Sequence, residues 1–209
     1  MLFRSEEPAS APPIAAAAPA QGPAQAQGGA EAPGAGSPAP STASPSVPDP
    51  VAARQAAASE LLADLKRRLA GESKAMQGPQ LDVQATEDGI LISLTDRQNF
   101  SMFPIGSAEP QPRVLHMIEA IAASLQNLQG AIVVRGHTDA RPYRSATYDN
   151  WRLSSARAQM AYSMLIRGGL SEKRFERVEG YADHHLRDSS HPLAAENRRI
   201  EILLREAKP

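Results

Sequence analysis

The chain has no cysteine, no long apolar run and almost no net charge, and each absence excludes a class of structure or function. Without cysteine it can form neither a disulfide nor a thiolate metal site, although either redox compartment remains possible. A formal net charge of −1 gives no electrostatic case for nucleic-acid binding, which needs a concentrated basic face. No apolar run approaches the ~20 residues that span a bilayer, and the first ten residues lack the apolar region of a secretory signal. Taken alone, the sequence predicts a soluble chain.

Aromatic residues are scarce, and all of them except Phe3 lie between Phe100 and Tyr181. The hydrophobic fraction overstates the core, because much of it is alanine in the first fifty residues. Residues 1–50 are rich in Pro, Ala, Gly, Gln and Ser, so they bury too little apolar surface to offset the entropy of ordering them. We expect a disordered linker there, with a Pro-rich ligand for a recognition module as the less favoured alternative.

Residues 51–77 are predicted to form an amphipathic linker helix. Asp49 suits the cap, Pro50 suits the first helical position, and the helix should end before Gly71. A helix of this length is marginal alone, so its apolar stripe should dock on the following domain or on a second copy of the chain. Acidic residues dilute the basic charge that a membrane-surface helix would need. The stripe consists of Ala58, Leu61, Leu62, Leu65 and Leu69.

Residues 78–209 are predicted to form one domain of class α+β, with a mixed β-sheet and helices packed on one face. Alternating apolar residues predict strands, and apolar residues at helical spacing predict two helices between them. The turn Glu87-Asp88-Gly89 is a good hairpin signal. The expected order is strands 81–86 and 89–95, a helix from Val114 towards Gly130, strand 131–136, helix 150–167, strand 175–182 and strand 197–204.

A strand that ends in Asp139 is followed by a helix that starts at Asn150 and carries Arg157 at the edge of its apolar stripe. A partly buried guanidinium needs a partner, because an unpaired one costs several kcal/mol. An acid and an arginine held close together suit a zwitterion with one ammonium and one carboxylate. Spacing alone nevertheless favours a purely structural salt bridge between Asp139 and Arg157.

The histidines give no metal or cofactor prediction. His184, His185 and His191 lie in one polar stretch, but adjacent histidines point in different directions and the stretch lacks a fixed ligand spacing. We expect a solvated loop there. His137 faces the same side as Asp139 by strand alternation, and a structural hydrogen bond is favoured over a role at the rim of a site.

Hydroxyl and aromatic residues lie close to Arg157 in the sequence. Ser154 is not a nucleophile signature, because no recognisable motif places a base beside it. Tyr143, Tyr148 and Trp151 flank the predicted site and suit stacking on sugar rings, although Trp151 fits a core position equally well.

Three motifs in order, GHTDA (136–140), NWRLSSARA (150–158) and NRRIEI (197–202), resemble those of OmpA-like peptidoglycan-binding domains. The finer resemblance is to the flagellar motor stator family MotB. It rests on the loop RPYRSATYDNW, on MFPIGSAEP (102–110) and RFERVEGYAD (174–183), and on the Ala-rich and Pro-rich segments before the domain.

The resemblance implies a ligand and a set of contacts. Asp139 would receive the ammonium group of diaminopimelate in a peptidoglycan stem peptide, and Arg157 would clamp its carboxylate bidentately, which lysine cannot do. The remaining implied contacts are a rim of Thr138, Asn150 and Leu153, with added charge from Arg198 or Arg199.

The resemblance also implies a non-catalytic role, as the cell-wall anchor of a stator subunit in the periplasm that self-associates as a homodimer. MotB reaches its partner MotA through an N-terminal membrane helix, and nothing in this sequence resembles that helix. We therefore expect a periplasmic fragment or a truncated reading frame. A general OmpA-like or Pal-like cell-envelope tether is the alternative, and a cell-wall hydrolase using His137 or His184 is disfavoured.

Overall fold

A computed structural model describes residues 50–70, 78–142 and 149–206. The expected cap Asp49, the linker before it, Tyr143 and Tyr148 lie outside these ranges. None of the helices in the described ranges is both long and apolar enough to cross a membrane. The main elements are α1 (Pro50–Leu69), β1 (Gln80–Thr86), β2 (Gly89–Thr95), α2 (Pro112–Leu125), β3 (Ala131–His137), α3 (Asn150–Arg167), β4 (Phe175–Gly180) and β5 (Arg199–Arg205).

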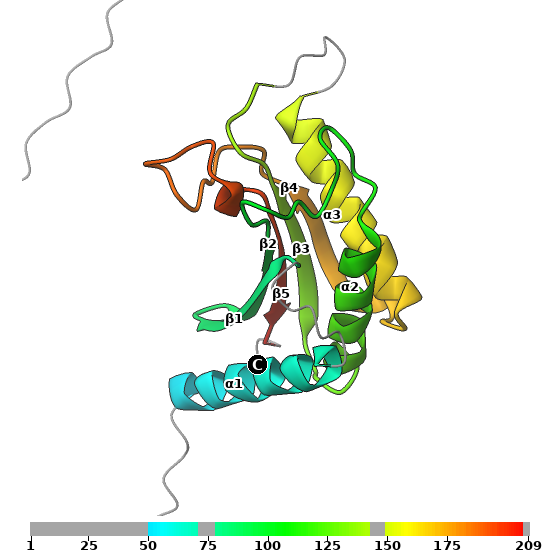
Figure 1. Cartoon of the computed structure of the whole chain (residues 1–209). Helices are drawn as coiled ribbons and strands as arrows, with labels where there is room; N and C mark the ends of the chain where they lie inside the picture. Colours follow the sequence, from blue (N-terminus) through cyan, green and yellow to red (C-terminus); the bar gives the residue numbers. More distant parts are fainter. Residues whose placement is uncertain (1–49, 71–77, 143–148, 207–209) are drawn as a thin grey trace, which may run out of the picture. The chain divides into compact units, whose positions relative to one another are not determined.

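The strands form one mixed sheet in the order β1-β2-β5-β3-β4 (Figure 1). β1 pairs antiparallel with β2, and β5 pairs antiparallel with both β2 and β3. β3 and β4 are parallel, because the chain returns through α3 before it enters the sheet again. The last strand therefore lies at the centre of the sheet, with the ends of β2 and β3 on either side of its start.

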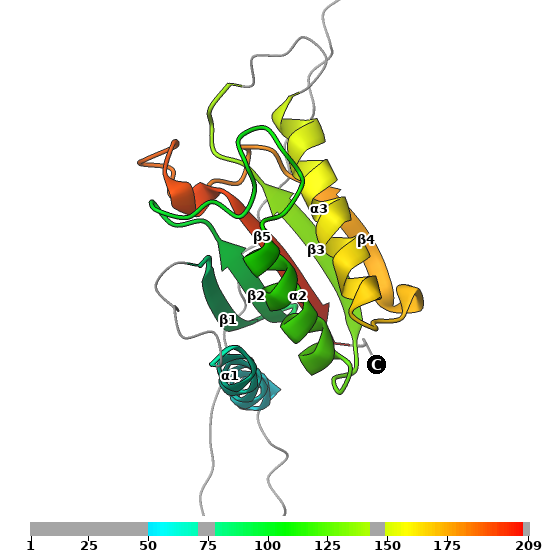
Figure 2. The same ribbon diagram turned by 45° about the vertical axis from the view of Figure 1, so that its right-hand side comes forward.

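Helices α2 and α3 cover one face of the sheet (Figure 2), which confirms the predicted fold class. Alternate residues of the strands point into the core beneath these helices, as the period of a strand requires. Ile92 of β2, Val134 of β3 and Ile202 of β5 are completely buried there. From α2, Ile118 and Ile121 fill the same core.

The apolar stripe of α1 docks on the domain, as predicted. Ala58, Leu61 and Leu65 are buried within the same core, and the helix packs on β1 and α2. A polar contact fixes the docked position, because Ser124 of α2 donates to the carboxylate of Asp64 at 2.7 Å. Hydrogen bonds from Arg68 and Ser124 lower the pKa of Asp64 to about 2, in spite of some desolvation.

Two predicted strand boundaries and one buried face are corrected. β4 ends at Gly180 because Ala182 adopts a φ of 49°, which no strand can contain. β5 begins at Arg199, two residues after the predicted start at Asn197. The reason is that the side chain of Asn197 turns back to the preceding loop, where its Oδ1 accepts from the backbone amide of Asp188 at 2.8 Å. On α3 the buried face includes Arg157 together with Ser154 and Ala158, so Arg157 does not lie at the edge of that face as expected, and Ala156 and Met160 are half-buried.

Candidate ligand-binding site

A cavity of about 620 Å³ opens where β3 ends and α3 begins. Its walls come from the loop after β2, the segment after β3, the first two turns of α3 and the residue before β5. All six residues predicted to contact a ligand line this cavity. The lining residues are Ser101, Phe103, Ile105, Gly106, Thr138, Asp139, Arg141, Pro142, Asn150, Leu153, Arg157 and Arg198.

Backbone hydrogen bonds hold Asp139 at the base of the cavity. The amide of Thr138 donates to the carbonyl of Ala182 at 2.9 Å, and the amide of Ala140 donates to the carbonyl of Pro192 at 3.0 Å. In addition, the side-chain Nδ2 of Asn150 donates to the carbonyls of Asp139 and Arg141, at 3.5 and 3.1 Å, and so ties this segment to the start of α3. Asp139 itself is 5% exposed, so its charge lies out of bulk water.

Two glycines allow α3 to lie directly against the ends of β3 and β4. A Cβ atom at Gly136 would collide with the carbonyl of Ser154, and one at Gly180 would collide with the backbone and hydroxyl of Ser155. The hydroxyl of Ser154 then accepts from the amide of Ala182 at 3.0 Å, which is a structural contact. Because the helix can approach so closely, its first turns and the strand end share one cavity.

Arg157 belongs to α3, two turns after the helix start, and also lines the cavity. The side chain of Asp149 caps that start by accepting from the amide of Arg152 at 2.8 Å. Nε of Arg157 donates to the carbonyl of Ser107 at 3.0 Å, and its guanidinium carbon lies 4.8 Å from the centre of the Phe103 ring. Phe103 therefore acts as a cation–π support that holds a guanidinium which is only 5% exposed.

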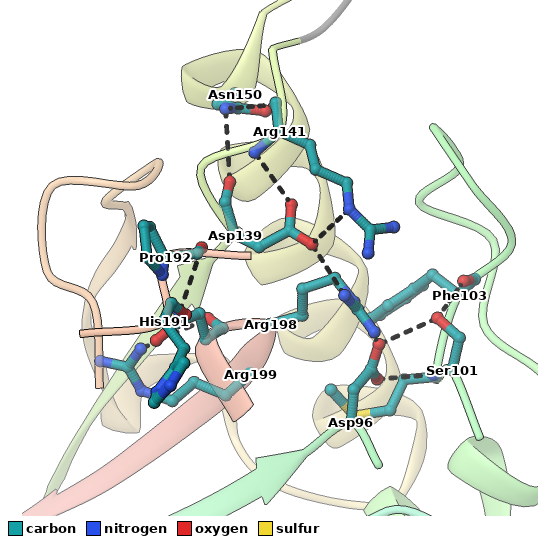
Figure 3. Close-up of polar contacts among 12 residues, drawn as sticks. Asp96, Ser101, Phe103, Asp139, Arg141, Asn150, His191, Pro192, Arg198 and Arg199 are labelled. Carbon is teal, nitrogen blue, oxygen red and sulfur yellow. Dashed lines mark hydrogen bonds and ion pairs between the residues drawn. The ribbon is translucent and has the colours of Figure 1, made fainter. Parts of the chain in front are cut away.

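Among the described residues, Asp139 pairs with Arg198 and Arg141 instead of Arg157 (Figure 3). Nη1 of Arg198 donates to Oδ2 of Asp139 at 2.7 Å, while Nε of Arg141 lies 3.5 Å from the same oxygen. The amide of Arg141 donates to Oδ1 at 3.3 Å. The acid and the arginine expected to bind the two ends of a zwitterion are thus held by different partners within one cavity.

Asp96 is a buried acid that the sequence analysis did not predict for the site. It pairs with Arg198 on the side that faces away from Asp139. Asp96 follows β2, is 3% exposed and accepts from Nε of Arg198 at 2.7 Å, from the amide of Met102 at 2.7 Å and from Ser101 Oγ at 2.9 Å. Burial opposes the charge on Arg198, but the hydrogen bonds to Asp96 and Asp139 outweigh it and raise the pKa of Arg198. The only signal in the sequence was an acid directly after an apolar strand, which is common at strand ends.

The other arginine considered for the site, Arg199, lies outside the cavity lining. Its Nε pairs with Glu201 at 2.7 Å on the sheet face away from the helices. His137 belongs to the same group, with Nε2 3.4 Å from Oε2 of Glu201 and its ring stacked on Tyr181 at 5.2 Å. His137 therefore has no place at the rim, and its ring nitrogens make no hydrogen bond with the described part of the chain.

This group on the open face of the sheet carries two shifted pKa values. Burial lowers the pKa of His137, and that effect is larger than the opposing influence of Glu201. Burial alone would raise the pKa of Glu201, but His137 and Arg199 hold it at about 2. The pair thus favours an ionised carboxylate beside a neutral imidazole.

The histidines after β4 make separate local contacts. His184 stacks on Trp151 with ring centres 4.8 Å apart, His185 meets the edge of Tyr181, and Nδ1 of His191 lies 2.8 Å from Asp188. No three acidic or histidine side chains in the described ranges come close enough to hold a metal ion. Trp151 is half-exposed at 49%, so it is not a core residue.

The cavity as a whole suits a small ligand that carries charges of both signs. Asp139 offers a carboxylate to a cation, while Arg157 and Arg198 offer planar donors to an anion. Thr138 is 2% exposed, and its hydroxyl has no hydrogen-bond partner among the described residues, which leaves one further polar group at the base. Leu153 and Phe103 supply an apolar wall between these groups.

The segment that holds most of this cavity is similar to known proteins. Residues 102–199 match the OmpA family. The chain is 37% identical over 128 residues to motility protein B of Escherichia coli K12, which covers 60% of this chain and 42% of that protein. It spans no more than 59% of the length of the curated relatives that it matches.

Two solved structures share the fold. The cell wall anchor of the type VI secretion system (T6SS) from Pseudomonas aeruginosa is 31% identical with a TM-score of 0.53, and the match covers 68% of this chain and 97% of that one. The periplasmic domain of Helicobacter pylori MotB is 22% identical with a TM-score of 0.52, and the match covers 62% of this chain and 85% of that one. The second likeness is one of fold alone.

Proposed function

Because this chain has an OmpA-like domain, matched over residues 102–199 and homologous to motility protein B, we propose that it binds peptidoglycan without catalysing a reaction on it. The bound group would be the free zwitterionic end of diaminopimelate in a stem peptide. In the cell, the chain would anchor a flagellar stator subunit to the wall from the periplasm.

The observation that carries this proposal is the presence of both Asp139 and Arg157 in the lining of one cavity. Both residues are 5% exposed, and different neighbours support each of them. Two opposite charges that lie out of water and do not neutralise each other suit a ligand that brings the complementary pair. The ligand's ammonium would bind Asp139, and its carboxylate would accept from the Arg157 guanidinium.

A general cell-envelope tether of the OmpA or Pal type is the alternative. It would use the same cavity and the same ligand, so the cavity does not discriminate between them. What favours the stator role is the match to motility protein B, whose 128 aligned residues extend beyond the 98 residues of the family match. Motility that depends on the chain, measured by swimming after its deletion and restoration, would separate the two roles.

The test of binding is a pulldown on purified peptidoglycan. We expect Asp139→Asn and Arg157→Gln each to weaken binding about 30-fold or more, because loss of one partner of a buried charge pair costs about 2–5 kcal/mol. Asp139→Asn keeps the shape of the side chain, and Arg157→Gln keeps the aliphatic stem and a polar end, which limits the disturbance of the fold.

Arg167→Gln is the matched control, since Arg167 is exposed and lies at the far end of the same helix, about 15 Å along its axis. Circular dichroism establishes that each variant is folded. Full binding by a folded Asp139→Asn variant would reduce this carboxylate to a structural partner of Arg198 and would refute the proposal.

A further inference from the structure

Arginines outnumber acids around the cavity. Arg141, Arg157 and Arg198 line it, whereas Asp139 is the one carboxylate among the lining residues that the structure describes. Asp96, which pairs with Arg198 outside the cavity lining, offsets part of this excess of positive charge. A ligand with one ammonium and one carboxylate adds no net charge and leaves the excess unchanged. A ligand that brings one more carboxylate would remove it.

The two arginines on Asp139 are held very differently. Arg198 is 18% exposed, lies 2.7 Å from Asp139 and is fixed on its other side by Asp96 at 2.7 Å. Arg141 is 60% exposed and lies 3.5 Å from the same oxygen. An ammonium that approaches Asp139 from solvent would therefore displace the Arg141 side chain and leave Arg198 in place.

A displaced Arg141 would remain next to the incoming ammonium, and like charges at this distance repel each other. The repulsion is relieved if a carboxylate of the ligand lies between them or accepts the guanidinium. The adjoining lip is apolar and open, with Pro142 in the lining and Ile105 98% exposed. It can support the carbon chain that would connect such a carboxylate to the zwitterionic end.

We propose that the cavity selects a ligand with a second carboxylate near its zwitterionic end, and that Arg141 binds this second carboxylate. The inference rests on the proposed function, because the zwitterionic end must occupy Asp139 and Arg157 for Arg141 to be displaced. Arg141 is then a specificity-determining residue that caps Asp139 in the empty cavity and changes partner when the ligand arrives.

The test compares two probes by isothermal titration calorimetry. The first is N-acetyl-meso-diaminopimelate, which keeps one zwitterionic end and carries a free carboxylate at the acetylated end. The second is the same molecule with that carboxylate replaced by a carboxamide. We expect the acid to bind the wild-type chain about three- to tenfold more tightly at low salt, with the preference reduced at high salt because Arg141 is partly exposed.

Arg141→Gln should abolish the preference, because the acid then loses the partner of its second carboxylate, while Arg167→Gln should leave the preference unchanged. Equal binding of both probes to the wild-type chain would overturn the inference and leave the proposed function intact. Equal weakening of both probes by Arg141→Gln would also overturn it, because Arg141 would then act on the shared end. Absence of binding by either probe would refute the proposed function, and the inference with it.

Discussion

Replacing Asp96 by asparagine removes one negative charge from the buried chain of contacts that joins Asp96, Arg198 and Asp139. The asparagine oxygen can still accept from the amide of Met102, which now lies 2.7 Å from the carboxylate. Its NH₂ group, however, would face the Arg198 guanidinium, so that two donors would meet where a 2.7 Å ion pair stands. The change therefore keeps the shape of the side chain and reverses one interaction.

The stability that Asp96→Asn is expected to lose follows from the burial of this ion pair. Breaking a buried ion pair by removing one partner costs about 3–5 kcal/mol, because an uncompensated charge is left behind. Here Arg198 retains Asp139 and is 18% exposed, so water and the second carboxylate relieve part of that cost. We expect the free energy of unfolding to fall by about 2–3 kcal/mol.

The same substitution should weaken ligand binding. With Asp96 neutral, Arg198 interacts with Asp139 alone and competes more strongly against the ligand's ammonium. We expect the affinity for N-acetyl-meso-diaminopimelate to fall about three- to tenfold, an effect of roughly 1 kcal/mol.

Urea denaturation and calorimetry measure the two effects. Asp82→Asn is the control, because Asp82 is more exposed and pairs with Arg187 at the longer distance of 3.3 Å, so it should cost less than about 1 kcal/mol. A double-mutant cycle with Arg198→Gln should be non-additive in both measurements. Unchanged stability and affinity in Asp96→Asn would refute the reasoning that this buried acid holds Arg198 in place.

Two further predictions concern the core and the open face of the sheet. Leu65→Ala should lower the free energy of unfolding by about 2–5 kcal/mol, because Leu65 is fully buried where α1 docks. If urea denaturation shows a loss below about 1 kcal/mol, α1 is not docked in solution. The free energy of unfolding should fall as pH decreases below about 6.5, because the pKa of His137 is lowered in the folded chain and the unfolded chain therefore binds a proton first. It should fall further between about pH 4.5 and pH 2, because the folded chain holds the pKa of Glu201 at about 2 and the unfolded chain again binds a proton first. In His137→Gln the loss between about pH 7 and pH 5 should be smaller, and an unchanged slope in urea denaturation would contradict this assignment.

Much of the fold was predictable because its signals are local. Apolar periodicity located the helices and strands, the turn before Gly89 fixed the hairpin, and the stripe around Leu65 indicated docking. The strand order was not predictable. The insertion of β5 between β2 and β3 depends on long-range pairing, which no local pattern in residues 199–205 encodes.

The site was predictable to the extent that its residues lie near the ends of elements. Asp139 and Arg157 were expected together, and both line the cavity. Strand alternation was a poor guide to His137, because β3 ends there and the direction of Asp139 is set by loop contacts. Asp96 was missed because its partner, Arg198, lies 102 positions away in the sequence.

The most direct test of the binding site is a crystal structure of the chain with N-acetyl-meso-diaminopimelate. The ligand should lie in the cavity, with its ammonium within hydrogen-bond distance of Asp139 and the carboxylate of the same end bound by Arg157. A ligand bound elsewhere, or one that occupies the cavity without contacting Asp139 and Arg157, would contradict the account.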